Sequence, residues 1–133
     1  MNFRSNKLLA SLGLSSATLL LAACAGSGLY ATPAAKISDG VLVGANGMTL
    51  YTFDKDTAGS GKSVCNGPCA TNWPPLLAAD GDAAAGDYSI VQRDDGKRQW
   101  AFKGKPLYYW IKDQKPGDKT GEGFNNVWRS ARP

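Results

Sequence analysis

Short runs of alternating or β-branched apolar residues predict β-strands in the part of the chain beyond residue 36. Residues 41–43 (Val-Leu-Val) follow the turn dipeptide Asp39-Gly40. Residues 88–93 alternate between apolar and polar positions as a half-buried strand does, and residues 98–102 follow a second turn dipeptide, Asp95-Gly96. No long stretch shows the apolar spacing of a helix. The pattern therefore predicts an all-β fold of small antiparallel hairpins.

One short pattern occurs twice, 57 residues apart, and divides this β region into two copies. Residues 50–56 and 107–113 both read Leu-Tyr-x-aromatic-x-x-Asp, and each copy continues through a glycine-containing loop to a tryptophan. A repeat whose motif, glycine-containing loop and tryptophan follow in the same order indicates a duplicated structural unit. We therefore expect one domain, residues 36–133, made of two related antiparallel β-meanders at about residues 36–79 and 88–130. The shared positions are Tyr51, Phe53, Asp56 and Trp73 in the first copy and Tyr108, Trp110, Asp113 and Trp128 in the second.

Two interpretations of the repeated motif are open from the sequence. In the first, the motif aromatics form the core, and Asp56 and Asp113 accept backbone N–H groups of the loops that follow them. Any functional surface then lies on those loops, around residues 65–73 and 116–124. In the second, the aromatic residues and the nearby carboxylates line a ligand cleft. We favour the first, because a small repeated β-domain needs large side chains for its core.

The beginning of the chain predicts export and lipidation. Basic residues Arg4 and Lys7 precede an apolar run at residues 8–21, and Leu21-Ala22-Ala23 then leads directly to Cys24. This order is typical of a lipoprotein signal peptide, here residues 1–23, with a lipid attached to the Cys24 thiol. A transmembrane helix needs about 20 apolar residues, more than this run offers. An ordinary secretory signal with an unmodified cysteine is the other alternative.

Composition limits the partners that we expect. Half of the net charge of +4 belongs to the signal peptide, and no basic cluster typical of nucleic-acid binding remains after it. Residues 24–35 are small and polar and predict a flexible tether between the lipid and the domain. The lipid makes the membrane a partner, and Ala25 after the cysteine favours the outer membrane in a cell with two membranes. In a cell with one membrane, we expect the outer face of that membrane.

The remaining cysteines, Cys65 and Cys69, predict a disulfide, because cysteines of exported domains usually pair. A ring this small is expected to contribute about 2 kcal/mol through loop entropy. A reversible redox pair and a soft metal site are the alternatives. The chain has no histidine, which removes the commonest metal ligand and the usual general base. We therefore assign no cofactor, no metal and no catalytic residue; calcium at Asp113, Asp118 and Glu122 is a minor alternative.

Four segments together resemble a known family. They are the two Tyr-x-aromatic-x-x-Asp motifs, the cysteine loop at residues 63–76, and residues 116–123, which lead to Trp128. The combination is similar to bacterial lipoproteins with secreted repeats that carry this motif. The resemblance spans residues 36–130 and implies an exported, repeated β-domain. That family is described by its location and its repeat, so the resemblance implies no activity.

These observations predict a non-enzymatic envelope lipoprotein that acts as a binding or interaction module. Its partner is expected to be another envelope protein or a small ligand. The alternative is an accessory for redox or metal handling that uses Cys65 and Cys69, and a small hydrolase is a weaker third hypothesis.

Replacing Cys24 with serine tests the predicted anchor. We expect C24S protein to be misprocessed or released from the membrane, because a serine hydroxyl replaces the thiol that carries the lipid. Fractionation and intact-mass spectrometry measure both effects. Membrane-bound wild-type protein with an unmodified Cys24 would contradict the prediction.

Overall fold

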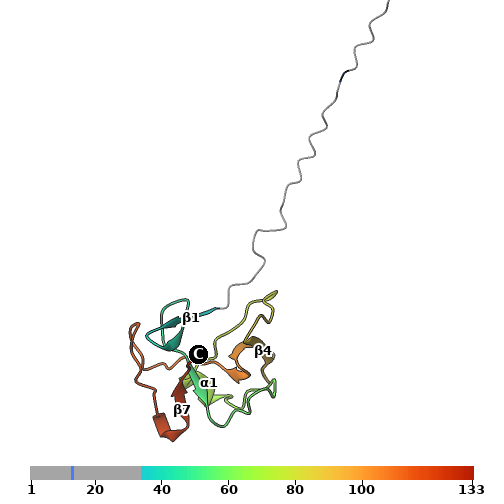
Figure 1. Ribbon diagram of the computed structural model, residues 1–133. Helices are drawn as coiled ribbons and strands as arrows, with labels where there is room; N and C mark the ends of the chain where they lie inside the picture. Colours follow the sequence, from blue (N-terminus) through green and yellow to red (C-terminus); the bar gives the residue numbers. More distant parts are fainter. Residues whose placement is uncertain (1–12, 14–33) are drawn as a thin grey trace, which may run out of the picture.

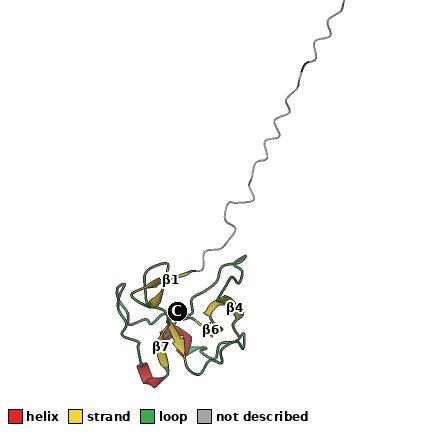
Figure 2. Ribbon diagram, in the orientation of Figure 1, coloured by secondary structure: helices red, strands yellow, loops and turns green. Residues whose placement is uncertain are grey.

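The computed structural model describes residue 13 and residues 34–133, so Cys24, nearly all of the expected signal peptide and most of the expected tether lie outside the described residues. Short strands and long loops make up the described part, together with one α-helix and one 3-10 turn (Figure 2). None of the helices described there has the length and apolar character needed to cross a bilayer. The predicted all-β class, with two repeats and small antiparallel sheets, is confirmed as a mostly β fold, to which the described residues add the two short helical turns.

Each repeat begins with an antiparallel hairpin. β1 (Ala35–Ser38) pairs with β2 (Val41–Gly44) in the first repeat, and β4 (Tyr88–Gln92) pairs with β5 (Arg98–Phe102) in the second. Between β1 and β2, residues 39–40 have φ values of 50° and 75°. Two consecutive left-handed residues are what a two-residue hairpin turn requires, and an Asp-Gly pair supplies them at low cost. The turn dipeptides in the sequence therefore account for these hairpins.

A second tight turn extends the hairpin of the second repeat. Lys103 and Gly104 have φ values of 49° and 79° and connect β5 to β6 (Lys105–Pro106). A side chain at Gly104 would collide with the backbone, because its Cβ would lie 2.5 Å from the nitrogen of Gly59. The N–H of Gly59 donates to the carbonyl of Gly104 at 2.9 Å, so this turn is held against the loop of the first repeat.

The two repeats complete each other's sheets. β3 (Tyr51–Phe53) carries the first motif and pairs with β7 (Trp128–Ser130), the last strand of the second repeat. The other edge of β3 meets the second motif. The backbone N–H of Tyr51 donates to the carbonyl of Tyr108 at 2.8 Å, and the backbone N–H of Tyr108 donates to the carbonyl of Tyr51 at 2.9 Å. The second motif in turn pairs with the end of the first repeat, through a 2.7 Å bond from the N–H of Tyr109 to the carbonyl of Pro74. An approximate two-fold axis therefore passes between Tyr51 and Tyr108.

Matching rings of backbone hydrogen bonds show the same symmetry. In one ring, Leu42 donates to Ala131, Ala131 to Leu50 and Leu50 to Leu42, at 2.8–2.9 Å. In the other ring, Trp100 donates to Leu76, Leu76 to Leu107 and Leu107 to Trp100, at the same distances. All six side chains belong to one buried apolar cluster. Ala131 of the second repeat therefore occupies the position that Leu76 occupies in the first.

Strand alternation separates two cores. Leu50 and Leu107 enter the aliphatic cluster just described, whereas their neighbours Tyr51 and Tyr108 enter a second, mainly aromatic cluster. Each of these four side chains is fully buried. Successive residues of an extended strand point to opposite faces, which accounts for this division.

The loop after each motif ends in a short helical turn. α1 (Pro68–Asn72) starts at the proline after Gly67, whose φ is 56°, and Trp73 follows it directly. η2 (Phe124–Asn126) follows Gly123, whose φ is 72°, and precedes Trp128 (Figure 1). Both turns lead the chain back to a tryptophan of the aromatic core.

Separating the repeats tests their interdependence. We expect residues 34–83 and 84–133 to be unfolded as separate fragments, because each lacks the strands that complete its sheet. Mixed together they should recover the circular dichroism and the NMR dispersion of the intact domain. The matched control is the folded chain cleaved at the exposed bond between Ala83 and Ala84, which should stay assembled. A repeat that folds alone would contradict the exchange of strands.

Candidate functional site

The motif tyrosines and aspartates pair across the two repeats. The hydroxyl of Tyr51 donates to Asp113 Oδ2 at 2.6 Å, and the hydroxyl of Tyr108 donates to Asp56 Oδ2 at 2.5 Å. Both tyrosines are fully buried, and Asp113 is only 8% exposed. A buried hydroxyl needs an acceptor, and a carboxylate is among the strongest available. Each repeat therefore supplies the acceptor for the other repeat's tyrosine.

These surroundings keep the phenols neutral. Burial raises the pKa of Tyr51, and the adjacent Asp113 raises it further. Burial and the hydrogen bond to Asp56 likewise raise the pKa of Tyr108 well above its usual value. The pKa of Asp56 is also raised by burial, although hydrogen bonds from Tyr108 and the Val64 N–H oppose the increase. The tyrosine hydroxyls are thus internal donors, poorly suited to act as bases or nucleophiles.

Both aspartates also hold the loop that follows them. Asp56 Oδ1 accepts the N–H of Val64 at 2.7 Å. Asp113 Oδ1 accepts the N–H of Thr120 at 3.0 Å and its hydroxyl at 2.6 Å. Each carboxylate therefore connects its own loop to the tyrosine of the other repeat. The interpretation as turn residues explains the first contact, and only the structure reveals the second.

The other motif aromatics form a continuous stack at the symmetry axis. Trp73 and Trp128, one from each repeat, lie with ring centroids 3.8 Å apart and planes 5° apart. Phe53 stacks on Trp128 at 4.3 Å, and Trp110 stacks on Trp73 at 4.0 Å. Trp73, Trp110 and Trp128 are at most 8% exposed, and Phe53 is half-buried. The aromatic residues therefore pack with one another and do not line an open cleft.

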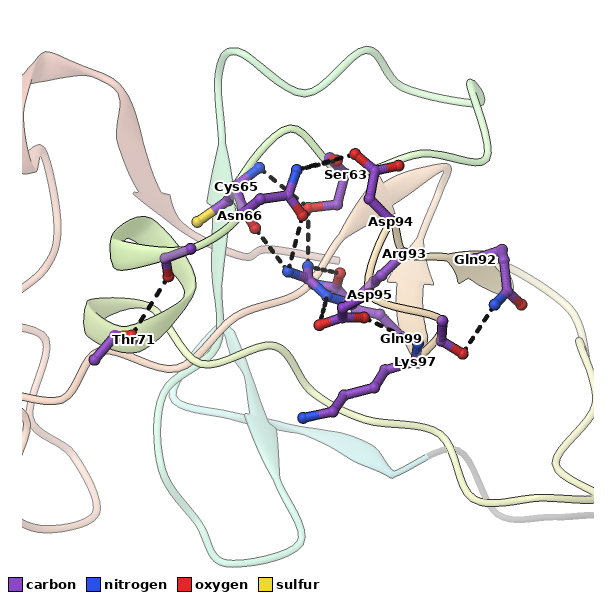
Figure 3. A network of polar contacts seen from close by, with 12 residues as sticks. Ser63, Cys65, Asn66, Thr71, Gln92, Arg93, Asp94, Asp95, Lys97 and Gln99 are labelled. Carbon is purple, nitrogen blue, oxygen red and sulfur yellow. Dashed lines mark hydrogen bonds and ion pairs between the residues drawn. The ribbon is translucent and has the colours of Figure 1, made fainter.

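The cysteine loop is anchored on a buried arginine. Cys65 and Cys69 form a disulfide, and Cys65 is fully buried. The guanidinium of Arg93, 2% exposed, donates to the Cys65 carbonyl at 2.7 Å, to Ser63 Oγ at 3.0 Å and to Gln99 Oε1 at 2.8 Å (Figure 3). Ser63 in turn shares a 2.6 Å hydrogen bond with the hydroxyl of Tyr108. A polar network thus runs from Arg93 to the motif.

The sequence did not identify Arg93 as important. It stands in a polar run, Arg-Asp-Asp-Gly, that is typical of an exposed turn, and its neighbours Asp94 and Asp95 are exposed. The Nε of Arg93 lies 3.5 Å from Asp95 Oδ2, an ion pair that reaches only the rim of the network. The alternating pattern of residues 88–93 was the one available signal, because it places residue 93 on the same face as the buried Val91.

The three carboxylates considered for calcium have separate partners. Asp113 binds Tyr51 and Thr120, as described above. Asp118 Oδ2 accepts backbone N–H groups in its own loop, from Gln114 at 2.9 Å and from Lys115 at 3.2 Å. Glu122 accepts the N–H and the hydroxyl of Ser130. No group of three or more potential metal ligands occurs among the described residues.

The surface contains a charged groove beside β7. It has a volume of about 310 Å³ and extends between β3, the turn from β5 to β6, and the segment after β7. Phe102 and Ala131, both buried, contribute its apolar part. Its charged side chains are Lys103, Lys105, Arg129, Arg132, Asp54 and Glu122.

Glu122 remains ionised in this groove. Burial by itself raises its pKa, but the hydrogen bonds from Ser130 and the nearby Arg132 and Arg129 outweigh burial and lower the pKa. Asp54 pairs with Arg129 at 3.2 Å. The groove therefore combines fixed charges of both signs with an excess of cations.

Comparison with known proteins gives one match. Residues 34–77 and 89–132 each match a family model described as a secreted repeat of unknown function. The two matched segments are the two halves that the approximate two-fold axis relates, and together they cover well over half of the chain. Neither the curated proteins nor the solved structures give a significant match.

Removing one motif hydroxyl tests whether the tyrosine–aspartate pairs support the fold. We expect Tyr51→Phe to lower the free energy of unfolding by about 1.5–3 kcal/mol, as for the loss of a buried hydrogen bond to a charged group. Denaturant melts measure this difference.

Tyr88→Phe is the matched control. The ring of Tyr88 packs against Trp100, and its hydroxyl makes no hydrogen bond within residues 34–133. We expect this change to stay within about 0.5 kcal/mol of wild type. Equal melts for the two variants would show that the Tyr51–Asp113 bond does not support the fold.

Proposed function

The chain belongs to the lipoprotein family whose repeat is described as a secreted repeat of unknown function, and we propose that it is a membrane-anchored, non-enzymatic binding module. Family membership implies a location outside the cytoplasm. The membrane at which the protein is held is part of the proposal. Lipid on Cys24 holds the protein at the outer membrane of a cell with two membranes, or at the outer face of a single membrane.

The observation that carries this proposal is that the polar groups of the motif form hydrogen bonds with one another and with their own loops inside the protein. The hydroxyls of Tyr51 and Tyr108 face Asp113 and Asp56, and the carboxylates also hold their loops. A catalytic group must reach substrate with a free proton or lone pair, whereas these four groups lie in the interior with protein partners. Such a motif supports a rigid scaffold, which favours binding over chemistry.

The binding surface belongs on exposed segments that this scaffold positions. Loops on a rigid frame concentrate binding residues, and most of this domain is loop (Figure 2). The groove beside β7 combines a concave shape with fixed charge and reaches Glu122, in the second motif loop. We therefore assign binding to this groove, which overlaps only the 116–124 part of the loop surface expected from sequence.

Redox or metal handling by Cys65 and Cys69 is the alternative function. The contact between Arg93 and the Cys65 carbonyl favours it, because a nearby cation stabilises a thiolate. The complete burial of Cys65 argues against it, since thiol–disulfide exchange needs an accessible sulfur and only the half-buried Cys69 is left to provide one. Binding is the better-supported function.

Site-directed photo-crosslinking in the native envelope tests the binding function. A photoreactive residue replaces the half-buried Thr52, which lines the groove, in the full-length lipidated chain. The control replaces Lys97, an exposed residue outside the groove. We expect a discrete adduct from position 52 and none from position 97. Identical patterns at the two positions, or none at either, would contradict binding at the groove.

A further inference from the structure

The groove beside β7 holds more positive charge than its own carboxylates balance. Its cations are Lys103, Lys105, Arg129 and Arg132. Of these, only Arg129 forms an ion pair within residues 34–133, with Asp54. Glu122 is the second carboxylate, and it accepts hydrogen bonds from the N–H and the hydroxyl of Ser130. All four cations are exposed and able to reach a ligand.

The internal symmetry of the molecule shows that the frame shared by the two repeats does not require an arginine at two of these four positions. Ala131 and Leu76 are equivalent by their backbone hydrogen bonds, so Arg132 corresponds to Leu77. Arg129 lies opposite Thr52 in the pairing of β3 with β7, and the equivalent pairing of the second motif involves Pro74. The same positions therefore carry an uncharged residue in one half and an arginine in the other. The two arginines are therefore particular to the second half and are not part of the repeated frame.

The apolar part of the groove narrows the class of ligand. Phe102 lies within it, and Lys103 Nζ is 5.3 Å from the centre of the Phe102 ring. A carboxylate has one charge and two oxygens and would leave some of the groove's four cations without a negatively charged partner. A phosphate monoester has three terminal oxygens, up to two negative charges and an organic group that can cover an apolar floor. Lysine and arginine are the side chains that proteins use for phosphate.

We propose that this groove binds the phosphate group of a phosphate ester, with Lys103, Lys105 and Arg132 as its main contacts. This inference rests on the proposed binding function and specifies its ligand. Arg129, held by Asp54, supplies fixed positive charge at one side of the groove. Phe102 and Ala131 contact the organic part of the ester. The ester is a phosphate monoester, and it comes from a soluble molecule or from the monoester headgroup of a phospholipid such as phosphatidic acid; these sources share the recognised chemistry.

Lysine acylation in the full-length lipidated protein tests the proposal. The protein is kept in uncharged alkyl maltoside micelles, and an amine-acylating reagent is applied with glycerol phosphate, or after transfer to vesicles containing phosphatidic acid. Mass spectrometry gives the rate at each lysine. At a ligand concentration ten times the dissociation constant, we expect Lys103 and Lys105 to react about tenfold more slowly, because only about a tenth of the grooves remain free. Lys97 is the internal control and should keep its rate.

Two comparisons separate binding from general screening by salt. Sodium chloride at matched ionic strength should leave the ratio of the Lys105 rate to the Lys97 rate unchanged. Arg132→Gln should weaken the protection by glycerol phosphate, whereas Lys97→Gln should not. Protection by the soluble ester supports the proposal with a soluble source, and protection in vesicles alone supports it with a lipid headgroup.

The proposal is overturned if neither phosphate source protects Lys103 and Lys105, or if chloride protects them equally. Loss of protection together with a retained crosslink at position 52 would reject phosphate while keeping the binding function. Loss of both would reject the binding function as well.

Discussion

The structure depends on the exchange of hydrogen bonds between the two motif tyrosines and the two motif aspartates. Each hydroxyl is buried, and the carboxylate that accepts its hydrogen bond lies in the other repeat. An unsatisfied hydroxyl or carboxylate at these positions would cost free energy. The same carboxylates hold the loops that return Trp73 and Trp128 to the aromatic stack. One pair of reciprocal contacts therefore couples the sheets, the loops and the core.

The symmetry is closest in the backbone of the aliphatic core and weakest in the loops that follow the two motifs. The backbone rings around Leu50 and Leu107 have the same connections and distances. In contrast, the loop after the first motif carries a disulfide and contacts Arg93, whereas the loop after the second carries Thr120. A duplicated frame can keep its shared contacts while its exposed positions differ. The features particular to one half are therefore the best guide to what this chain binds.

This division of roles explains why the repeated motif is a poor indicator of activity. Its tyrosines, aspartates and tryptophans are residue types that also occur in binding sites, and here they contact one another. The groove beside β7 instead uses side chains outside the motif, such as Lys105 and Arg132. Charge at the surface and satisfied polar groups in the interior are thus carried by different residues.

The sequence by itself determined the class of fold, the two copies and the positions of the hairpins. Strand periodicity, turn dipeptides such as Asp39-Gly40 and spacing between motifs are local properties that need no knowledge of contacts. Only the tertiary structure decided which copy pairs with which. Asp56 and Asp113 occupy the same position of the repeated motif, so the sequence pattern is the same whether each aspartate pairs with the tyrosine of its own repeat or of the other repeat. Arg93 was hidden for a related reason: its burial results from the approach of the cysteine loop, which lies 28 residues away along the chain.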